Sequence, residues 1–420
     1  MDMEPPLSDC SQQLLETLGN KGARVLELQR LLTACKSLGP ENGGAGEAAR
    51  AQIVADLLQK VGVEDILHVD CQDDRVPCGY RPNLVARIKG GTQKNLWIFG
   101  HLDTVGAGDL SAWHHDPWTV CQAGDFIYGR GVEDNQQAVC SMLILAESLQ
   151  SAGIVPEIGL GLVFMADEEC GSHYGLEHIL STVPNLFSGD DLYIVPDGGS
   201  PGGAEIEIAE KAQLWLKFTV LGAQCHASNP FLGRNAFVAS SRLVALLEEG
   251  LQATFSQKNP IFIPPVSTFV PTRHPANVEA VNIMPGREEF FVDCRLLPEV
   301  SVESVMERIS AITELASIEL AVEISFETVH CQKSTSTPES SPILPPLQKA
   351  ISAVYRVEPC LVGIGGATVA AFLRQKGLPA VVWSCLENTC HQPDERSSLT
   401  ATCKDAIVFA HLLFPGLANG

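Results

Sequence analysis

The sequence predicts an α/β protein in which a smaller α+β module is inserted into a discontinuous domain. In the first half of the chain, short apolar runs alternate with helical patterns, as in a sheet that helices cover on both faces. Near Glu207 the runs change to apolar–polar alternation, which is typical of strands with one buried face. After a linker rich in Pro, Ser and Thr at residues 332–346, the first pattern returns. At 420 residues the chain is also long for one domain and suits two.

The first half of the chain begins with helices and continues as strand–helix alternation. Helices are expected at residues 11–37, where leucine and valine recur at helical spacing, and at 46–62. The elements that follow are strands at 83–88, 95–99, 158–165 and 191–195, with a helix at 136–150. Because strands buried on both faces are almost continuously apolar, we expect a mixed, mostly parallel sheet covered by helices.

The middle of the chain has the element order of a ferredoxin-like module. The expected elements are a strand at 214–221, a helix at 236–250, strands at 278–283 and 288–293, a helix at 302–315 and a strand at 317–329. This β-α-β-β-α-β order suits the ferredoxin-like arrangement. We therefore place an inserted domain at residues 212–329 and a discontinuous α/β domain at residues 1–211 and 330–420.

The last part of the chain returns to the α/β pattern. Its expected elements are a helix at 346–356, a glycine-rich turn at 363–366, a helix at 367–376 and a strand at 380–384. These elements complete the α/β domain that the module interrupts.

The composition argues against several classes of protein. A formal net charge of −22 would repel nucleic acid and anionic membrane surfaces. The N-terminal residues lack a basic segment followed by an apolar one, and no apolar stretch is long enough to span a membrane. The 14 cysteines are scattered over the chain, which favours reduced thiols. We therefore expect a cytoplasmic protein that acts on a small molecule.

Acidic and histidine side chains follow the predicted strands, at the edge where their carboxyl ends should meet. The apolar run at 159–166 leads directly into Asp167, Glu168 and Glu169. Similar residues follow the other strands or open a helix: His101, Asp103, Asp134, Asp197, Glu387 and His391. Carboxylates packed this densely must either take up protons or bind a cation. The sequence therefore predicts a pair of divalent metal ions at this edge.

The residue types suggest how two ions would be held. Histidine and carboxylate ligands suit zinc and, less strictly, cobalt or manganese. A two-metal site also needs a bridging carboxylate, and Asp134 suits this position because a helix start points it inward. We expect His101 and Asp197 to complete one ion, and Glu169 and His391 to complete the other.

Two acidic side chains remain outside this ligand set. Asp103 lies two residues from His101 on an extended stretch, so it could orient the imidazole. Glu168 is left beside the ions without an ion of its own, as a hydrolase requires of the carboxylate that takes a proton from water. The pattern thus predicts a metal-dependent hydrolase with Glu168 as general base.

Eight motifs occur in order between about residues 80 and 400. They are "GHLDTV" (100–105), "WHHDPW...IYGRGVEDNQ" (113–136), "FMADEECGS" (164–172), "IVPDGG" (194–199), "GAQCHASNPFLGRNA" (222–236), "NVEAVNIMPGREEFFVDCRLLP" (277–298), "GIGGATVAAFLRQKGLPAVVW" (363–383) and "ENTCHQP" (387–393). Together they resemble the dizinc co-catalytic amidohydrolase/peptidase family of acetylornithine deacetylase, succinyl-diaminopimelate desuccinylase, aminoacylase and carboxypeptidase G. The resemblance implies the same five metal ligands, with Glu168 as the base and Asp103 behind His101.

The resemblance also implies functional residues in and after the inserted module. His226 would reach the site of a partner subunit and help hold the oxyanion, so we expect the active form to be a homodimer through this module or a hinged equivalent. Further residues would contact the substrate: Arg273, Asn277, Asn282, Gly365 and Gly366. The chain departs from the commonest family pattern at Cys225, Ala367, Thr368 and Cys390, and "KAQ" at 211–213 replaces a Lys-Gly turn. These departures weaken any transfer of substrate preference.

The expected activity is hydrolysis of an amide bond in a small substrate that carries a free carboxylate. Among family activities we favour an N-acyl amino acid deacylase of the acetylornithine or succinyl-diaminopimelate type. A dipeptidase or carboxypeptidase would have the same fold and ligands. A non-catalytic metal-binding dimer is the alternative of another class, but such a protein would be expected to have lost Glu168 or a ligand.

Overall fold

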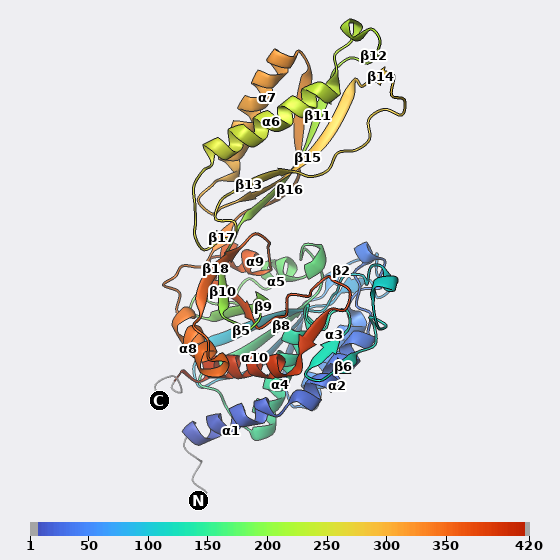
Figure 1. Cartoon of the computed structure of the whole chain (residues 1–420). Coiled ribbons are helices and arrows are strands. Elements are labelled where there is room, and N and C mark those ends of the chain that lie inside the picture. Colours follow the sequence, from blue (N-terminus) through green and yellow to red (C-terminus); the bar gives the residue numbers. More distant parts are fainter. Residues whose placement is uncertain (1–6, 416–420) are drawn as a thin grey trace, which may run out of the picture. The chain divides into compact units, whose positions relative to one another are not determined.

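The computed structural model describes residues 7–415, which form two compact units (Figure 1). The first unit contains the described residues up to Ile208, Thr337–Leu361 and those from Thr368 onward. The second contains Ala209–Ser336 and Val362–Ala367. Residues 1–6 and 416–420, which belong to the predicted α/β domain, lie outside the described residues.

The larger sheet is mixed, and its central strands run parallel. Its order is β1-β4-β8-β5-β9-β19-β10-β17, with β18 paired to β10. The bounds are β1 Asp65–His68, β4 Leu84–Ile88, β5 Asn95–His101, β8 Gly159–Met165, β9 Leu192–Gly199, β10 Glu205–Glu210, β17 Thr335–Ser336, β18 Cys360–Ile364 and β19 Ala380–Ser384. The neighbours β8, β5, β9 and β19 are parallel, whereas β4 is antiparallel to β1 and β8, and β10 is antiparallel to β19 and β17. The predicted α/β class and the predicted strands are confirmed.

Helices cover both faces of this sheet (Figure 1). On one face, α5 (Leu176–Thr182) and α9 (Ala370–Gln375) pack on alternate residues of the strands, such as Trp97 and Phe99. On the other face, α4 (Gln136–Ala152) packs against β5, and α10 (Leu399–Leu413) packs against α4. The remaining helices are α1 Leu7–Gly19, α2 Gly22–Ala34, α3 Ala48–Lys60 and α8 Leu344–Tyr355. Because both faces are covered, β8 is buried at every residue.

The single helix predicted at residues 11–37 is wrong, because the chain breaks into α1 and α2. The amides of Asn20 and Lys21 bond back three residues, to Thr17 and Leu18, which closes the first helix. The amide of Val25 then bonds four residues back to Lys21 and starts the second. Leucine spacing continues across the break, so periodicity alone does not reveal it.

The second unit has the predicted β-α-β-β-α-β order. Its elements are β11 Ala212–Leu221, α6 Ala236–Thr254, β13 Thr268–Pro271, β15 Arg287–Leu296, α7 Val302–Leu320 and β16 Glu323–Gln332. The four strands form an antiparallel sheet in the order β13-β15-β11-β16. A separate two-stranded ribbon joins β12 (Cys225–His226) to β14 (Ile283–Met284).

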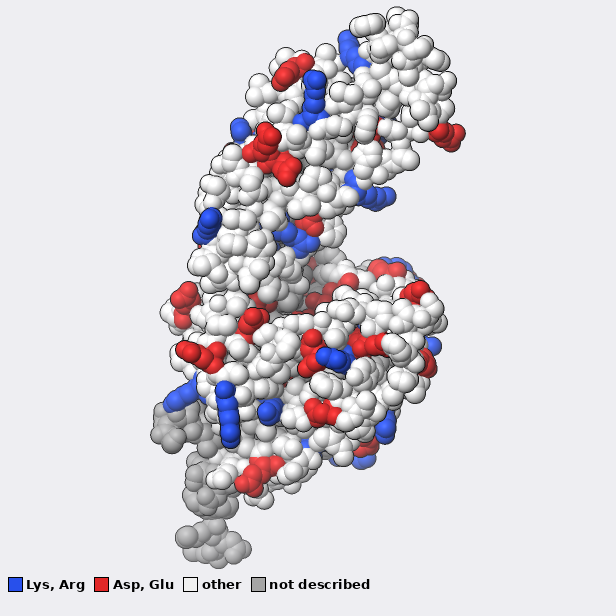
Figure 2. Space-filling view, in the orientation of Figure 1, with Lys and Arg blue, Asp and Glu red and all other residues white. Residues whose placement is uncertain are grey.

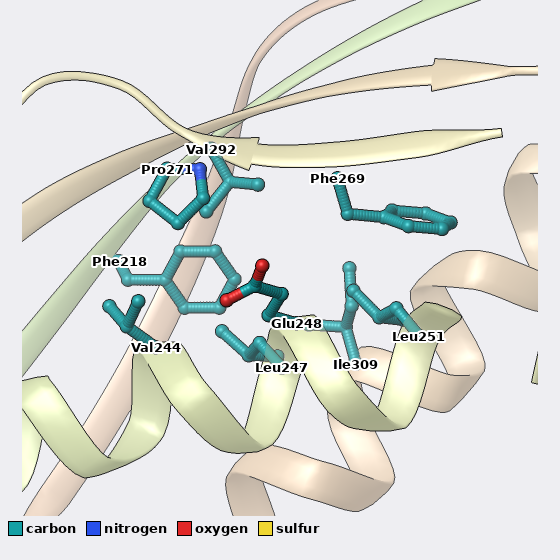
Figure 3. A pocket seen from close by; sticks show the side chains of 9 residues that line it. All are labelled: Phe218, Val244, Leu247, Glu248, Leu251, Phe269, Pro271, Val292 and Ile309. Atoms are coloured by element: carbon teal, nitrogen blue, oxygen red, sulfur yellow. The ribbon is translucent and has the colours of Figure 1, made fainter. Parts of the chain in front are cut away.

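The core of the second unit lies between its helices and one face of its sheet (Figure 3). Side chains from α6, α7 and the strands converge there, including Phe218, Leu247, Phe269 and Ile309. They leave a cavity of about 10 Å³, which is roughly the space for one water molecule. The interior of this unit is therefore packed and offers no room for a substrate at this place.

Three predictions in this region need correction. The strand expected at 278–283 is almost entirely loop, and β13 supplies the fourth strand of the sheet in its place. The strand expected at 317–329 begins later, because α7 continues to Leu320 and ends at Ala321, which has a positive φ of 53°. The linker at 332–346 is not free of structure, since Ser336 pairs with Ala209 in a short ladder.

Two further features concern the surface and the cysteines. Within residues 7–415, none of the helices combines the length and apolar character needed to cross a membrane. Figure 2 shows acidic and basic side chains interspersed on the visible face of both units. The cysteines from Cys35 to Cys403 are all free, as the sequence predicted.

Candidate metal centre

Three adjacent strands bring acidic and histidine side chains to one edge of the larger sheet. β5 ends at His101, β8 leads into the turn that carries Glu168 and Glu169, and β9 contains Asp197. Because these strands are parallel neighbours, their carboxyl ends lie together. His101 is in register with Met165, so the acidic turn starts beside it.

The carboxylate of Asp134 lies between two imidazoles. Its Oδ1 is 2.8 Å from His101 Nε2, and its Oδ2 is 3.0 Å from His391 Nε2. Glu169 Oε2 lies 3.1 Å from the same nitrogen of His391, and Asp197 Oδ1 lies 3.6 Å from His101 Nε2. The structure therefore brings together the five residues predicted as ligands, with Asp134 at the middle.

Two overlapping groups of three side chains are compact enough to hold an ion. They are His101, Asp134 and Glu169, and His101, Glu168 and Asp197, with all candidate ligand atoms of a group within 4.8 Å of one another. Glu168, which the sequence left without an ion, belongs to the second group. Imidazole nitrogen and carboxylate oxygen are the donors that zinc and similar ions take in proteins, so the set fits such ions.

Asp103 lies behind both His101 and the acidic turn. Its Oδ1 is 3.3 Å from His101 Nδ1, and its two oxygens accept hydrogen bonds from the backbone amides of Glu168 and Glu169, at 3.1 Å each. Because Nδ1 faces Asp103, Nε2 of the same ring is directed to Asp134. The backbone carbonyl of Asp103 lies 3.1 Å from Nδ1 of His101. Asp103 thus holds the imidazole through its backbone carbonyl and its carboxylate, and the turn through its carboxylate.

Burial and mutual repulsion disfavour negative charge on most carboxylates of this group. Burial raises the pKa of Glu168 well above its usual value, and the charge of Asp197 adds to the rise. The pKa values of Glu169 and Asp197 are raised as well, again chiefly by burial. Without a cation, these carboxyl groups tend to hold protons.

The histidines and Asp134 have the opposite tendency, because they contact each other. Hydrogen bonds to Asp134 and Glu169 raise the pKa of His391 to about 10. Burial opposes charge on His101, but Asp197 and the other carboxylates outweigh it and raise its pKa. Burial likewise opposes charge on Asp134, yet the two imidazoles hold its pKa below the usual range. The protein therefore offers this group only titratable positive charge.

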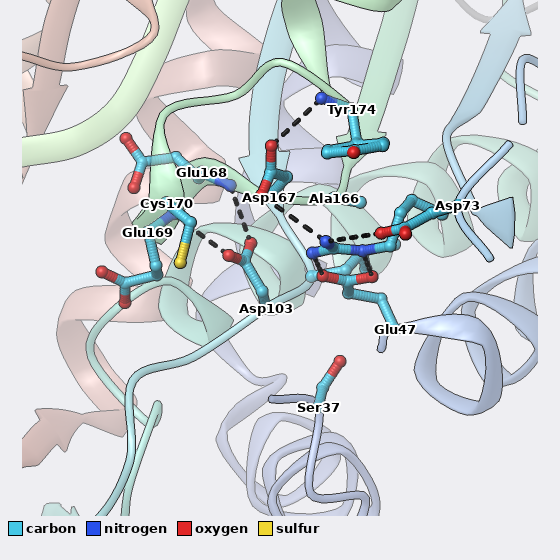
Figure 4. A network of polar contacts seen from close by, with 12 residues as sticks. Ser37, Glu47, Asp73, Asp103, Ala166, Asp167, Glu168, Glu169, Cys170 and Tyr174 are labelled. Atoms are coloured by element: carbon cyan, nitrogen blue, oxygen red, sulfur yellow. Dashed lines mark hydrogen bonds and ion pairs between the residues drawn. The ribbon is translucent and has the colours of Figure 1, made fainter. Parts of the chain in front are cut away.

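A second cluster of buried acids, which the sequence reasoning missed, adjoins the acidic turn (Figure 4). The Arg81 guanidinium is fully buried; it pairs closely with Glu47 and lies 3.6 Å from Asp73 Oδ2 and 3.5 Å from Asp167 Oδ1. Asp167 directly precedes Glu168 and has a positive φ of 66°. Arg81 and its partners come from distant parts of the chain, so no local pattern marks them. The sequence offers one signal for Arg81: it is an arginine that shortly precedes the predicted strand at 83–88, in a chain with 28 basic and 50 acidic residues.

Two of the remaining predicted residues lie together in the second unit. His226 is exposed on β12, with Nδ1 2.7 Å from the hydroxyl of Ser228. Asn282 is exposed next to β14, and its backbone carbonyl accepts a hydrogen bond from the backbone amide of Ala227. The ribbon of β12 and β14 thus brings His226 and Asn282 to neighbouring positions.

The other predicted substrate contacts also belong to the second unit. Arg273 is exposed and lies over the ring of Phe291, at 5.0 Å, and Asn277 donates a hydrogen bond to Glu288. The carbonyl of Gly365 accepts a hydrogen bond from Arg295, and the adjacent Gly366 is exposed. These contacts occupy the Asn277 side-chain amide and the Gly365 carbonyl within their own unit.

Known proteins resemble the chain over most of its length. A profile of peptidase family M20/M25/M40 matches residues 97–414. An uncharacterized metallohydrolase of Methanocaldococcus jannaschii is 38% identical over 403 residues, covering 93% of this chain and 98% of that protein. The succinyl-diaminopimelate desuccinylase of Alkalilimnicola ehrlichii is 26% identical over 376 residues, covering 89% and 94%. Among solved structures, human carnosine dipeptidase 1 matches with a TM-score of 0.73 and 14% identity, covering 98% and 99%.

Proposed function

The chain belongs to peptidase family M20/M25/M40 as a metal-dependent hydrolase of C–N bonds, and we propose that it removes the acyl group from an N-acyl amino acid. The substrate would be a small molecule with a free carboxylate, of the acetylornithine or succinyl-diaminopimelate type. The observation that carries metal-dependent hydrolysis is the position of Asp134, whose two oxygens each face a different histidine, and the choice of an acylated amino acid is supported by the similarity to a succinyl-diaminopimelate desuccinylase. One carboxylate shared in this way suits a two-metal site.

The proposed centre holds two divalent ions, with zinc as the expected metal and cobalt or manganese as substitutes. His101 and Asp197 would serve one ion, Glu169 and His391 the other, and Asp134 both. When bound, the two ions would polarise the scissile carbonyl and make water a nucleophile near neutral pH.

Glu168 is the proposed general base. Its carboxylate would take the proton from the attacking water and then deliver it to the leaving amine nitrogen. Asp103 supports this step, because it accepts the backbone amide of Glu168 and holds the turn in place. His101, whose Nδ1 faces the backbone carbonyl and the carboxylate of Asp103, would keep its Nε2 free for an ion.

The second unit is proposed to supply the substrate contacts. His226 would stabilise the oxyanion, and Arg273, Asn277 and Asn282 would hold the substrate, together with the Gly365-Gly366 loop. A homodimer through this unit follows from the role given to His226. Large apolar side chains such as Phe231 and Leu232 are exposed beside it, which supports an interface. A cytoplasmic location agrees with the free cysteines.

The test is a hydrolysis screen with protein loaded with zinc or cobalt. The panel contains N-acetyl and N-succinyl amino acids, dipeptides and folate-like glutamate conjugates, with the Glu168→Gln protein as the control for contaminating hydrolases. We expect the acylated amino acids to be cleaved fastest, and only by the protein that keeps Glu168. Faster cleavage of dipeptides would replace the deacylase proposal with a dipeptidase. Equal cleavage by both proteins would contradict the assigned base.

A further inference from the structure

Two buried carboxylates, Glu133 and Glu395, tie together the two segments that carry Asp134 and His391. Glu133 directly precedes Asp134, and Glu395 lies four residues after His391. The side chain of each glutamate nevertheless contacts the segment that carries the other proposed ligand. Both are almost completely buried, with exposed fractions of 2% and 0%. They have no assigned role in the ligand set or in proton transfer.

Glu133 accepts four hydrogen bonds from the segment before His391. The donors are the backbone amides of Glu387, Asn388 and Thr389 and the hydroxyl of Thr389. The Asn388 amide lies 3.0 Å from Oε1, and the Thr389 amide and hydroxyl lie 2.6 and 2.8 Å from Oε2. One carboxylate thus fixes three consecutive residues of this loop.

Glu395 makes the reciprocal set of contacts with the segment before α4. Its oxygens accept hydrogen bonds from the backbone amides of Gly131, Glu133 and Asp134, at 2.9, 2.9 and 3.1 Å. The fourth donor is Nη1 of the buried Arg130, at 2.7 Å. Each glutamate therefore receives three backbone amides and one side-chain donor from the opposite segment.

The surrounding backbone shows why such contacts are needed. Beyond the glutamate side chains, the two segments are joined by a short ladder, where β20 (Arg396–Ser398) meets β7 (Phe126–Tyr128), and by the amide of Gly129, which donates to the backbone carbonyl of Glu395 at 3.0 Å. The loop between carries positive φ angles at Asn388, His391 and Asp394, of 59°, 62° and 56°. Residues other than glycine rarely adopt this conformation without support from their surroundings. His391 itself is 52% exposed in its side chain, so packing does not hold it.

We infer that Glu133 and Glu395 are positioning residues, which set the distance between Asp134 and His391 and so make a shared ion possible. This inference rests on the proposed function, because it needs Asp134 and His391 to hold a metal. Charged acceptors form stronger hydrogen bonds with amides than neutral ones do. A glutamine at either position loses one acceptor oxygen and turns an amide group toward other N–H donors.

The test compares metal binding by Glu133→Gln, Glu395→Gln and the wild-type protein. Glu147→Gln is the matched control. Glu147 lies on α4, is buried, pairs with Arg24 and contacts none of the proposed ligands. The readouts are the affinity for each of two cobalt(II) ions and the visible absorption spectrum of the cobalt-loaded protein, which reports the coordination geometry.

We expect Glu133→Gln to weaken the ion that His391 would hold by about 10- to 100-fold and to change its spectrum. Glu395→Gln should weaken both ions, because its contacts reach the shared Asp134. Glu147→Gln should change neither property. Unchanged affinities and spectra in both folded glutamine variants would overturn the inference.

A double-variant cycle separates positioning from general stability. If Glu133 acts through His391, adding Glu133→Gln to a His391→Ala protein should not weaken the remaining ion further. An additive loss would mean that Glu133 stabilises the fold alone. Thr389→Val gives a milder variant in case the glutamine proteins do not fold. It removes the hydroxyl donor to Glu133 and the acceptor of the Arg396 amide, and it leaves the three backbone amides that face Glu133 in place. It should show the same loss to a smaller extent.

Hydrogen exchange in the metal-free protein distinguishes this inference from the proposed function. Thr389→Val and Glu133→Gln should speed exchange in residues 386–396, and Glu395→Gln should speed it in residues 130–136. If the wild-type protein binds two ions but cleaves no substrate, the proposed function fails and the inference stands or falls on the affinities. If it binds none, both the proposed function and the positioning role fail, whatever the exchange rates.

Discussion

Two clusters of acids, one buried and one half-buried, lie side by side at one edge of the larger sheet, and they are neutralised in different ways. In the first, three carboxylates with exposed fractions of at most 2% surround the guanidinium of Arg81: Glu47, Asp73 and Asp167. In the second, the proposed metal centre, four carboxylates surround His101 and His391. A guanidinium keeps its charge at any relevant pH, whereas an imidazole does not.

In the first cluster the chain itself supplies a permanent cation, Arg81. In the second cluster it leaves room for a bound cation. A third compact group, Glu41, Asp167 and Cys170, has donors of the kind that bind metals. However, Arg81 lies 3.8 Å from Glu41 and 3.5 Å from Asp167, so the positive charge is already present. The proposed centre contains no such residue among its members. We therefore expect metal ions in the second cluster and not in the first.

The two clusters meet at the acidic turn. Asp167 contacts Arg81, the next two residues belong to the proposed centre, and Asp103 holds their amides from the other side (Figure 4). The cluster around Arg81 thus holds in place the turn that carries Glu168 and Glu169 of the proposed metal centre.

The largest effect on activity is expected from Glu168→Gln. Loss of a general base typically costs about 10²- to 10⁴-fold in rate. The variant should keep its metal ions and its thermal stability, because Glu168 is assigned to proton transfer and Asp134, Glu169 and Asp197 remain. Steady-state kinetics on the best substrate from the screen, together with metal analysis, checks this. Near-wild-type turnover would remove Glu168 from the mechanism.

The largest effect on stability is expected from Arg81→Met. Removal of one partner from a buried ion pair costs about 3–5 kcal/mol, because it leaves unpaired buried charge. Denaturant unfolding of the metal-free protein measures the loss without interference from the proposed centre. A destabilisation below about 1 kcal/mol would show that the buried carboxylates do not depend on Arg81.

Asp103→Asn should have an intermediate effect, mainly on the proposed centre. Residues that orient metal ligands typically contribute about 10- to 100-fold to metal affinity or activity. The asparagine can still accept one of the two amides of the turn, so we expect most of the stability to remain. A calorimetric titration with zinc gives the affinity, and a loss of stability with unchanged zinc affinity would reassign Asp103 to the fold alone.

Arg75→Met should have the smallest effect. Arg75 pairs with Asp73 and Glu41, but its side chain is 46% exposed, and exposed ion pairs contribute little to stability because water and salt screen them. Measured beside Arg81→Met under the same conditions, this variant shows whether burial or the number of ion pairs decides the stability. Equal losses for the two arginine variants would favour the number of pairs.

The sequence predicted most of the larger sheet and the members of the proposed centre, for a common reason. Strands buried on both faces are continuous apolar runs, and the residues that follow them stand out as acids or histidines. His101 and Glu168 could be placed in this way because each adjoins its strand. In the second unit, the strand at 268–271 was missed, since it is short and lies near several prolines.

The contacts that support the proposed centre could not be predicted in the same way. Arg81 and Glu47 are 34 residues apart, and Glu133 contacts residues more than 250 positions away. Such pairs form only when the fold brings their segments together, so no periodicity or spacing in the sequence predicts them. The sequence therefore indicated the candidate functional residues, and the fold was needed to show which contacts hold them in place.

Metal content of the purified protein is the most direct test of the central claim. The protein is stripped with a chelator, loaded with excess zinc, freed of unbound ions and measured by mass spectrometry. We expect about two zinc ions per chain in the wild-type protein and in Arg75→Met, and fewer in Asp134→Ala. Zinc-free wild-type protein, or an Asp134→Ala protein that keeps both ions, would contradict the claim.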